Sequence, residues 1–315
     1  MRCKACFKAP NLGWLKWIAV QVGQELLELA RSIGARSIFV VGTGRNVGKT
    51  TALRAIYEAA WRQGLRVGLA SVGRDATPMW RGESPPKPRL WLRPGTAFAT
   101  ARPLLARSPA AEILKLSGLT SAAGGLLYAR TLHSGFYELG GPPTASGVSE
   151  VVDELLVDCD FTIVDGAVDR VAALAGSNGA IVVACGAAAA NTLQEAAEEI
   201  AALVARLRIA SVDPAVASIE VKGALTAAQA AAWIAARENR QIVVQDPTQV
   251  ALSGRAALEA FARLQIRCRR PLRVIAATIA SIGIERSFEP HAFARAVGAA
   301  TGLPTFDVYA GSAAA

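Results

Sequence analysis

The segment at residues 42–51 constrains the fold of this chain more than any other stretch. Its sequence is Gly-Thr-Gly-Arg-Asn-Val-Gly-Lys-Thr-Thr, and it follows the apolar run at residues 38–41. That run has the length and the β-branched side chains of a buried strand. Apolar side chains then recur at helical spacing from Leu53 to Ala60, and Gly64 is a natural helix stop. The sequence therefore predicts a strand, a glycine-rich turn and a helix in direct succession.

This succession is typical of a phosphate-binding loop. Glycines let backbone N–H groups converge on a polyphosphate, and the N-terminus of a helix favours negative charge. We predict that Lys49 contacts the phosphates and that the Thr50 hydroxyl ligates Mg²⁺. The residues expected to bind the nucleotide are Gly42, Thr43, Gly44, Arg45, Asn46, Val47, Gly48, Lys49, Thr50 and Thr51.

The spacing of this loop is unusual. The common form of the motif would place its first glycine at Thr43, so the spacing from Gly42 is one residue longer. A glycine-rich turn without a ligand is the simpler alternative.

Two carboxylates are expected near the loop. Residues 161–165 form an apolar run that ends in Asp165, as expected of a strand beside the loop whose last side chain reaches Mg²⁺ through water. Residues 66–72 predict a second parallel strand, and Arg74 and Asp75 follow it. Because ligands bind at the carboxyl ends of parallel strands, Asp75 is a further candidate for holding water or metal.

We therefore predict that Lys49, Asp75 and Asp165 are catalytic and that Thr50 and Asp165 are the metal ligands. A turn role for either aspartate is the alternative.

The alternation of strands and helices predicts an α/β protein with a parallel sheet, here a P-loop NTPase core with a further C-terminal α/β unit. We expect a helical lead at residues 1–34 and an NTPase domain at 35–215 with an insertion at 76–145. The C-terminal unit is expected at 216–315, where helix and strand alternate three times, either as a second parallel unit or as an extension of the first sheet. Inside the insertion, the pattern predicts a helix at 110–116, followed by a hairpin of residues 126–131 and 135–139.

The net charge of +9 restricts the partners. The positive excess lies in the first half of the chain, together with the loop. It suits a nucleotide, and it equally suits nucleic acid, an acidic protein or simply a basic solvated surface. No Lys/Arg run with interleaved aromatic residues is present, so nucleic-acid binding is disfavoured.

The number and spacing of the cysteines and the lengths of the apolar runs favour an intracellular protein. The five cysteines include one close pair, Cys3 and Cys6, and the two histidines, His133 and His291, lie far apart. This usage is typical of reduced proteins and disfavours a zinc site or a Ser/His/Asp hydrolase. No apolar run reaches about 18 residues and no signal-peptide pattern is present, so we expect no membrane partner and a cytoplasmic location.

The loop and the Asp165-Gly166-Ala167 turn resemble those of dethiobiotin synthetase and the related cobyrinic acid amidation enzymes. The resemblance covers about residues 35–210 and implies a P-loop fold that uses ATP and Mg²⁺. The substrate-side lysine of that family is absent after residue 72, and its Gly-Gly pair is replaced by Val168-Asp169. The MinD/ParA-like ATPases would have a second lysine where Gly44 stands, and no Asn-Lys-x-Asp box is present, which favours ATP over GTP.

A longer set of motifs resembles the P-loop subunit of the lysine 5,6-aminomutase reactivase. That resemblance implies an ATPase that helps to expel damaged cobalamin from a partner aminomutase. Two function classes therefore stand: an ATPase that remodels or reactivates a partner protein, and an ATP-dependent small-molecule ligase or kinase. The matching motifs lie at residues 42–51, 71–75, 94–97, 140–142, 165–170 and 222–226.

Overall fold

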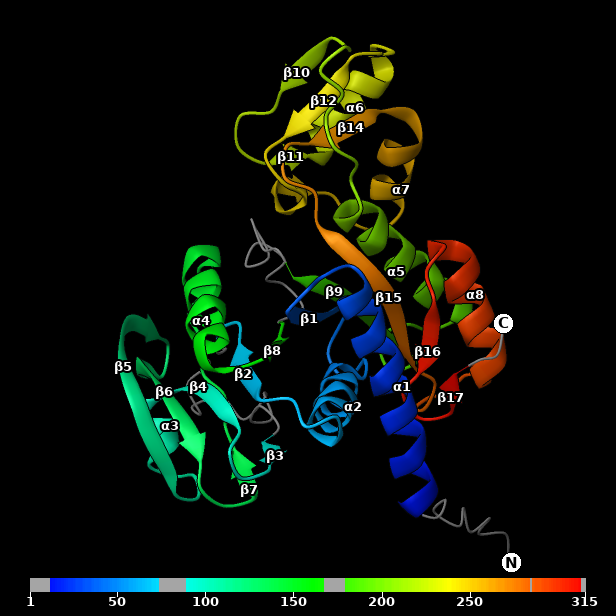
Figure 1. The fold of residues 1–315 in the computed structure, drawn as a ribbon. Helices are drawn as coiled ribbons and strands as arrows, with labels where there is room; N and C mark the ends of the chain where they lie inside the picture. The colour runs from blue at the N-terminus through cyan, green and yellow to red at the C-terminus, as the bar shows by residue number, and fades with distance from the viewer. Residues whose placement is uncertain (1–11, 74–88, 167–178, 284, 313–315) are drawn as a thin grey trace, which may run out of the picture.

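A computed structural model describes residues 12–73, 89–166, 179–283 and 285–312 (Figure 1). A ten-stranded sheet in the order β17-β16-β15-β9-β1-β8-β2-β4-β6-β5 forms its centre. The seven strands from β16 to β4 are mutually parallel, whereas β17, β6 and β5 run antiparallel to their neighbours. The prediction of an α/β protein with a mostly parallel sheet is confirmed.

The first part of the chain contains α1 (Leu12–Ser32), β1 (Ser37–Gly42), α2 (Lys49–Arg62), β2 (Val67–Ser71), β3 (Leu90–Leu92), β4 (Ala97–Ala101), α3 (Arg102–Leu105), β5 (Ala111–Ser121), β6 (Gly124–Thr131), β7 (Gly135–Tyr137), α4 (Ala145–Asp158) and β8 (Phe161–Asp165). The second part contains β9 (Ala180–Gly186), α5 (Leu193–Leu207), β10 (Ser218–Glu220), β11 (Leu225–Thr226), α6 (Ala227–Ala235), β12 (Gln241–Val244), η3 (Pro247–Gln249), β13 (Val250–Ala251), α7 (Gly254–Arg263), β14 (Gln265–Cys268), β15 (Arg273–Ala280), α8 (Pro290–Thr301), β16 (Thr305–Asp307) and β17 (Gly311–Ser312).

Helices cover both faces of the sheet. Buried side chains of α4, α5 and α8 pack on one face with Phe39 and Val41 of β1. Those of α1 and α2 pack on the other face with Ile38 and Val40. Because β1 is buried on both sides, its sequence is continuously apolar rather than alternating.

The helix that follows β1 and the helix that follows its neighbour β9 lie on opposite faces. α2 belongs to one core and α5 to the other, although β1 and β9 are adjacent strands. In open α/β sheets this reversal opens a crevice at the carboxyl ends of the two strands. The glycine-rich loop lies at the end of β1 and therefore at this crevice.

The predicted N-terminal helix packs beside the sheet, against α2. A Cβ on Gly23 would lie 2.0 Å from the Ala55 carbonyl oxygen, so the two helices approach more closely than any other residue type at position 23 would allow. None of the helices in the described part of the chain is both long enough and apolar enough to cross a membrane.

Two predictions for the insertion were wrong. Residues 111–121 form strand β5 rather than a helix, because they pair with β6 along the edge of the main sheet. The expected hairpin does not form either: β6 pairs with β4 and β5, whereas β7 pairs with β3. The insertion therefore widens the main sheet through β4, β6 and β5.

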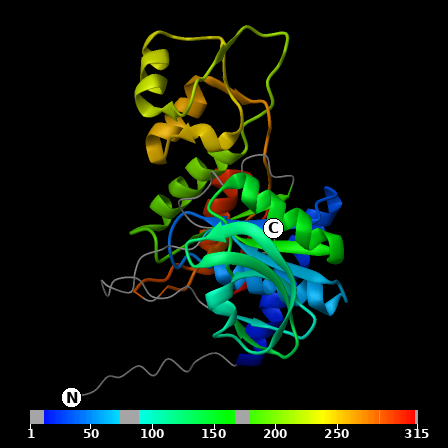
Figure 2. The same ribbon diagram turned by 90° about the vertical axis from the view of Figure 1, so that its left-hand side faces the viewer.

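The segment expected as one C-terminal unit, residues 216–315, occupies two places. Strands β10, β12 and β14 form a separate three-stranded sheet that, with α6 and α7, makes a lobe above the main sheet in both views (Figures 1 and 2). Strands β15, β16 and β17 instead return to the main sheet beside β9. The lobe is thus inserted between α5 and β15.

Candidate phosphate-binding site

The loop at residues 43–48 joins β1 directly to α2, as predicted. The Thr43 N–H donates to the Ala184 carbonyl of β9 at 2.9 Å, which fixes the start of the loop on the neighbouring strand. The backbone then needs positive φ angles at Asn46 (56°) and Gly48 (85°). Gly48 is the N-cap of α2 and provides no side chain to satisfy the first amides of the helix.

Val47 holds the loop against the end of β9. Its side chain is buried, and a Cβ on Gly186 would lie 2.8 Å from its Cα. A Cβ on Gly42 would meet both the Ala184 oxygen and a Val47 methyl group at 2.8 Å. The glycines on either side of this contact are therefore required by the close approach of two backbones.

Three backbone donors in the loop have no backbone acceptor in the part of the chain that the structure describes. Within the described residues, the amides of Gly44, Asn46 and Gly48 donate to no backbone carbonyl. The Thr43 hydroxyl is buried and likewise has no hydrogen-bond partner there. Unused amides at the start of a helix are the donor set that a phosphate requires, so the residues present fit a polyphosphate.

Lys49 lies over the loop rather than in the core. Its Nζ donates to the Gly44 carbonyl at 2.5 Å, so the ammonium group is held near the unused amides. Thr50 follows it in the first turn of α2 and is partly exposed. The loop therefore gathers a cation, a hydroxyl and backbone donors at one helix end.

Asp165 ends the strand beside β1, as predicted. Val40 lies opposite Asp165 in the parallel β1–β8 pair, and the Gly166 N–H donates to the Val40 carbonyl at 2.9 Å. On the other side, the Val72 N–H donates to the Asp165 carbonyl at 2.9 Å. The neighbouring position is confirmed, whereas a role for this carboxylate in binding metal stays a prediction.

Asp75 and Arg74 lie outside the described residues, as do Asp169 and Arg170. The segment after β2 is described as far as Gly73, whose N–H donates to the Pro142 carbonyl at 3.0 Å. A Cβ on Gly141 would lie only 1.4 Å from the Ser71 carbonyl oxygen. The end of β2 is therefore packed directly on the turn that leads into α4.

The sequence did not reveal how α2 is joined to the insertion. The buried Tyr57 hydroxyl lies 2.7 Å from the Thr96 hydroxyl and accepts from the Arg93 N–H at 2.8 Å. The Arg93 guanidinium pairs with Glu58 at 2.9 Å and stacks over the Trp61 ring at 4.1 Å. Helical spacing placed Tyr57 on an apolar face, and no pattern indicated the polar partners of its hydroxyl.

Asp307 is a second residue that sequence reasoning missed. It ends β16, is almost fully buried, and accepts hydrogen bonds from the Tyr309 and Ala310 amides at 2.8 and 3.3 Å. Burial raises the pKa of Asp307, and hydrogen bonding from these two amides partly offsets the rise. A Cβ on Gly48 would lie 3.0 Å from the Ala280 Cβ and 3.3 Å from a Val308 methyl group, so β15 and β16 end directly behind the loop.

The arrangement brings together what the sequence predicted at 42–51 and at Asp165, on adjacent strands and at one edge of the sheet. Comparisons of this chain with models of protein families, with curated proteins and with solved structures found no match.

Proposed function

We propose that this chain is an ATPase of the P-loop class that binds Mg-ATP and uses its hydrolysis to remodel or reactivate a partner protein. One observation carries the proposal. The loop that follows β1 holds a lysine and backbone amides without a backbone acceptor, and the neighbouring strand β8 ends in Asp165. The loop lies at the crevice between β1 and β9, and Asp165 ends β8 on the other side of β1.

ATP, when bound, supplies the phosphoanhydride bond whose hydrolysis provides the free energy. On this chain the amides of Gly44, Asn46 and Gly48 would bind phosphate oxygens, and Lys49 would neutralise part of their charge. Thr50 and Asp165 hold Mg²⁺, the first through its hydroxyl and the second through water. The resemblance to the dethiobiotin synthetase group supports ATP and Mg²⁺ as the cofactors.

Contacts that run from the loop to the insertion support action on a protein. α2 begins at the loop, and three of its side chains contact Arg93 of the insertion. Tyr57 accepts a hydrogen bond from the Arg93 N–H, Glu58 pairs with the guanidinium, and the Trp61 ring lies beneath it. The end of β2 is packed on Gly141 and bonded to Pro142. These contacts give a route by which a change in the loop would reach surface elements, as in switches that respond to the γ-phosphate. The resemblance to the aminomutase reactivase would make that partner a cobalamin-dependent enzyme.

Asp165 gives the direct test of the proposed metal role. We expect Asp165→Asn to lower Mg²⁺-dependent ATP turnover by at least about tenfold and to change ATP affinity much less, because the metal contributes mainly to the chemical step. Asp153→Asn, an exposed change on α4, is the matched control. Unchanged turnover of Asp165→Asn at saturating Mg²⁺ would remove this residue from the site.

The same assay separates the two function classes. An ATPase that acts on a partner protein is expected to hydrolyse ATP slowly on its own. Its rate should remain slow when small carboxylate or hydroxyl acceptors are added. Rapid ATP consumption on addition of one small acceptor would instead identify a ligase or kinase.

A further inference from the structure

Strand β5 forms one edge of the main sheet. It spans Ala111–Ser121, pairs with β6 on one side, and has no other strand beside it among the described residues (Figure 1). Edge strands present unpaired N–H and C=O groups that can accept a further strand. β5 is a long strand of 11 residues. Bulges interrupt its register with β6 at Leu114 and between Leu116 and Thr120.

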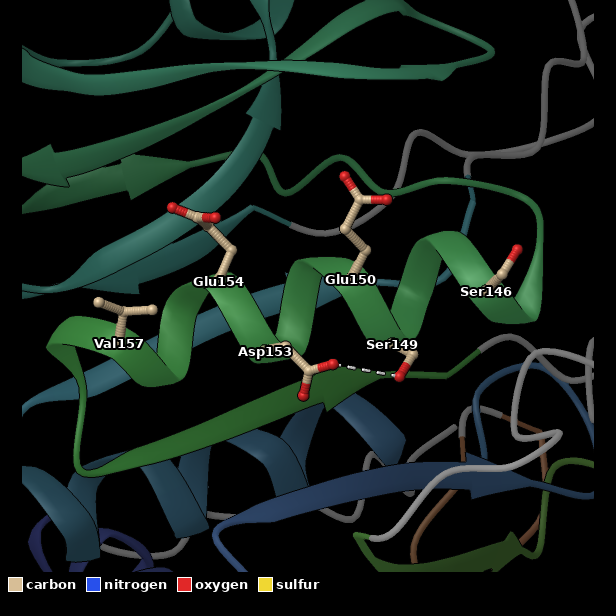
Figure 3. A pocket seen from close by; sticks show the side chains of 6 residues that line it. All are labelled: Ser146, Ser149, Glu150, Asp153, Glu154 and Val157. Atoms are coloured by element: carbon tan, nitrogen blue, oxygen red, sulfur yellow. Dashed lines mark hydrogen bonds between the residues drawn. The ribbon is translucent and has the colours of Figure 1, made fainter.

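One face of this edge is acidic. The groove along α4, of about 560 Å³, is lined by Ser146, Ser149, Glu150, Asp153, Glu154 and Val157 (Figure 3). Glu150 and Glu154 point toward the strands of the insertion, and Glu154 pairs with Lys115 of β5 at 2.7 Å.

Two more carboxylates, Glu112 and Asp158, lie 3.9 and 3.8 Å from Arg130. Four carboxylates thus share this face with the two cations Lys115 and Arg130, within a chain of net charge +9: those of Glu112, Glu150, Glu154 and Asp158. Asp153 instead points away from the strands of the insertion (Figure 3).

The other face of the same edge is apolar. Ile113 lies opposite Ala129 and Leu116 opposite Leu127, and both partners belong to the core on the side away from α4. Directly opposed residues in an antiparallel pair point to the same face. Ile113 and Leu116 are therefore on the apolar side, where they are 54% and 71% exposed.

We propose that the β5 edge binds an extended segment of a partner protein in which basic and apolar residues alternate. Side chains of an added strand point alternately to the two faces, so its basic residues would face the α4 carboxylates and its apolar residues would face Ile113 and Leu116. The proposal deepens and rests on the proposed function, since it names where the partner sits.

Charge disfavours a second copy of this chain as the occupant. Antiparallel pairing of two β5 edges about a two-fold axis would place two acidic α4 faces side by side, and like charges would repel. A basic segment instead neutralises this face.

The position of this edge also suits the proposed coupling. α4 follows the turn at Gly141 and Pro142, which is packed on the end of β2, and leads directly into β8. β8 then ends at Asp165 beside the loop. A partner strand at β5 whose basic residues reach the α4 carboxylates would therefore contact α4. This helix connects the turn packed on the end of β2 to strand β8, which ends in Asp165.

Fluorescence anisotropy on the full-length protein, without nucleotide and at low salt, tests the assignment. The probe is a short labelled peptide of alternating Lys and Val. The comparison peptides are one of the same composition with its lysines clustered, one of alternating Glu and Val, and the Lys/Val peptide with N-methylated backbone. We expect binding of the first alone, because only it offers both the alternation and the backbone donors.

Charge reversal identifies the surface. Glu112→Lys combined with Glu150→Lys, two exposed residues on β5 and α4, is expected to weaken binding of the Lys/Val peptide by about tenfold or more. Glu198→Lys combined with Glu259→Lys, two exposed residues on α5 and α7, changes the net charge equally and should leave binding unaltered.

Equal binding to both double variants, or undiminished binding of the clustered or N-methylated peptide, would overturn the proposal. If the protein dimerises without peptide, dimerisation that becomes stronger in the Glu112→Lys/Glu150→Lys variant would also overturn the proposal, in favour of a second copy. If the peptide fails to bind while Lys49→Ala weakens ATP binding as expected, the docking surface fails and the proposed function stands.

Discussion

Asp160 and Arg66 fasten the amino ends of β8 and β2. The guanidinium donates to both carboxylate oxygens at 2.7 and 3.2 Å, and the Arg66 N–H donates to one of them at 2.9 Å. These bonds from the Arg66 side chain and backbone lower the pKa of Asp160 from 3.8 to about 2. The folded-state pKa thus lies below the unfolded one, so the pair stabilises the fold above about pH 4 and loses this contribution as pH falls toward 2.

We predict that Asp160→Asn lowers the urea midpoint of unfolding at neutral pH and that the difference from wild type disappears as the pH approaches 2. Urea titrations across this range, with Asp153→Asn as the control, measure it. A constant difference at every pH would show that the carboxylate charge contributes nothing.

At the residue scale, the sequence predicted the loop and its neighbouring carboxylate because both follow short-range rules. A glycine between a strand and a helix, and an aspartate at the end of an apolar run, are visible within a few positions of the chain. Tyr57 was missed because its partners Arg93 and Thr96 are distant in the sequence. Asp307 was missed because only the pairing of β16 with β15 brings the end of its strand behind the loop. No local pattern carries that information.

At the element scale, the turn before α4 is pressed against β2. The missing side chain at Gly141 is what allows this contact, because a Cβ there would lie 1.4 Å from the Ser71 oxygen. We predict that Gly141→Ala lowers the free energy of unfolding by about 1–3 kcal/mol, the usual cost of overpacking. It should also separate the turn from the site.

Gly118→Ala is the matched control, since a Cβ on this β5 glycine meets nothing within 4 Å. Urea unfolding of both variants gives the comparison. Equal stability of Gly141→Ala and Gly118→Ala would contradict the tight junction between β2 and the α4 turn.

Elements buried on both faces were predicted well, and elements at the edge were not. Phe161–Asp165 is a strand with the predicted bounds, because a continuous apolar run in a parallel sheet has few alternatives. Residues 110–116 contain good helix formers, and the prediction of a helix followed from them. Pairing with β6 overrode that local preference, as tertiary context commonly does.

At the scale of the whole molecule, the order of the strands could not be predicted from the sequence. The helix–strand repeats after residue 216 look alike, yet β12 and β14 enter the lobe whereas β15 and β16 join the main sheet. Each set buries its own apolar cluster, and which cluster a strand joins depends on contacts across the full chain. The return of β15 matters for the site, because it places Ala280 and Val308 behind Gly48.

The central claim is that the loop at residues 43–48 binds the phosphates of ATP through Lys49, and isothermal titration with Mg-ATP tests it most directly. We predict that the wild-type protein binds and that Lys49→Ala, while still folded, loses about 1.5–3 kcal/mol of binding free energy, the contribution of hydrogen bonds to a charged group. Lys222→Ala, an exposed lysine of the lobe, should bind as wild type does. Unchanged Mg-ATP affinity in the folded Lys49→Ala variant would contradict the account.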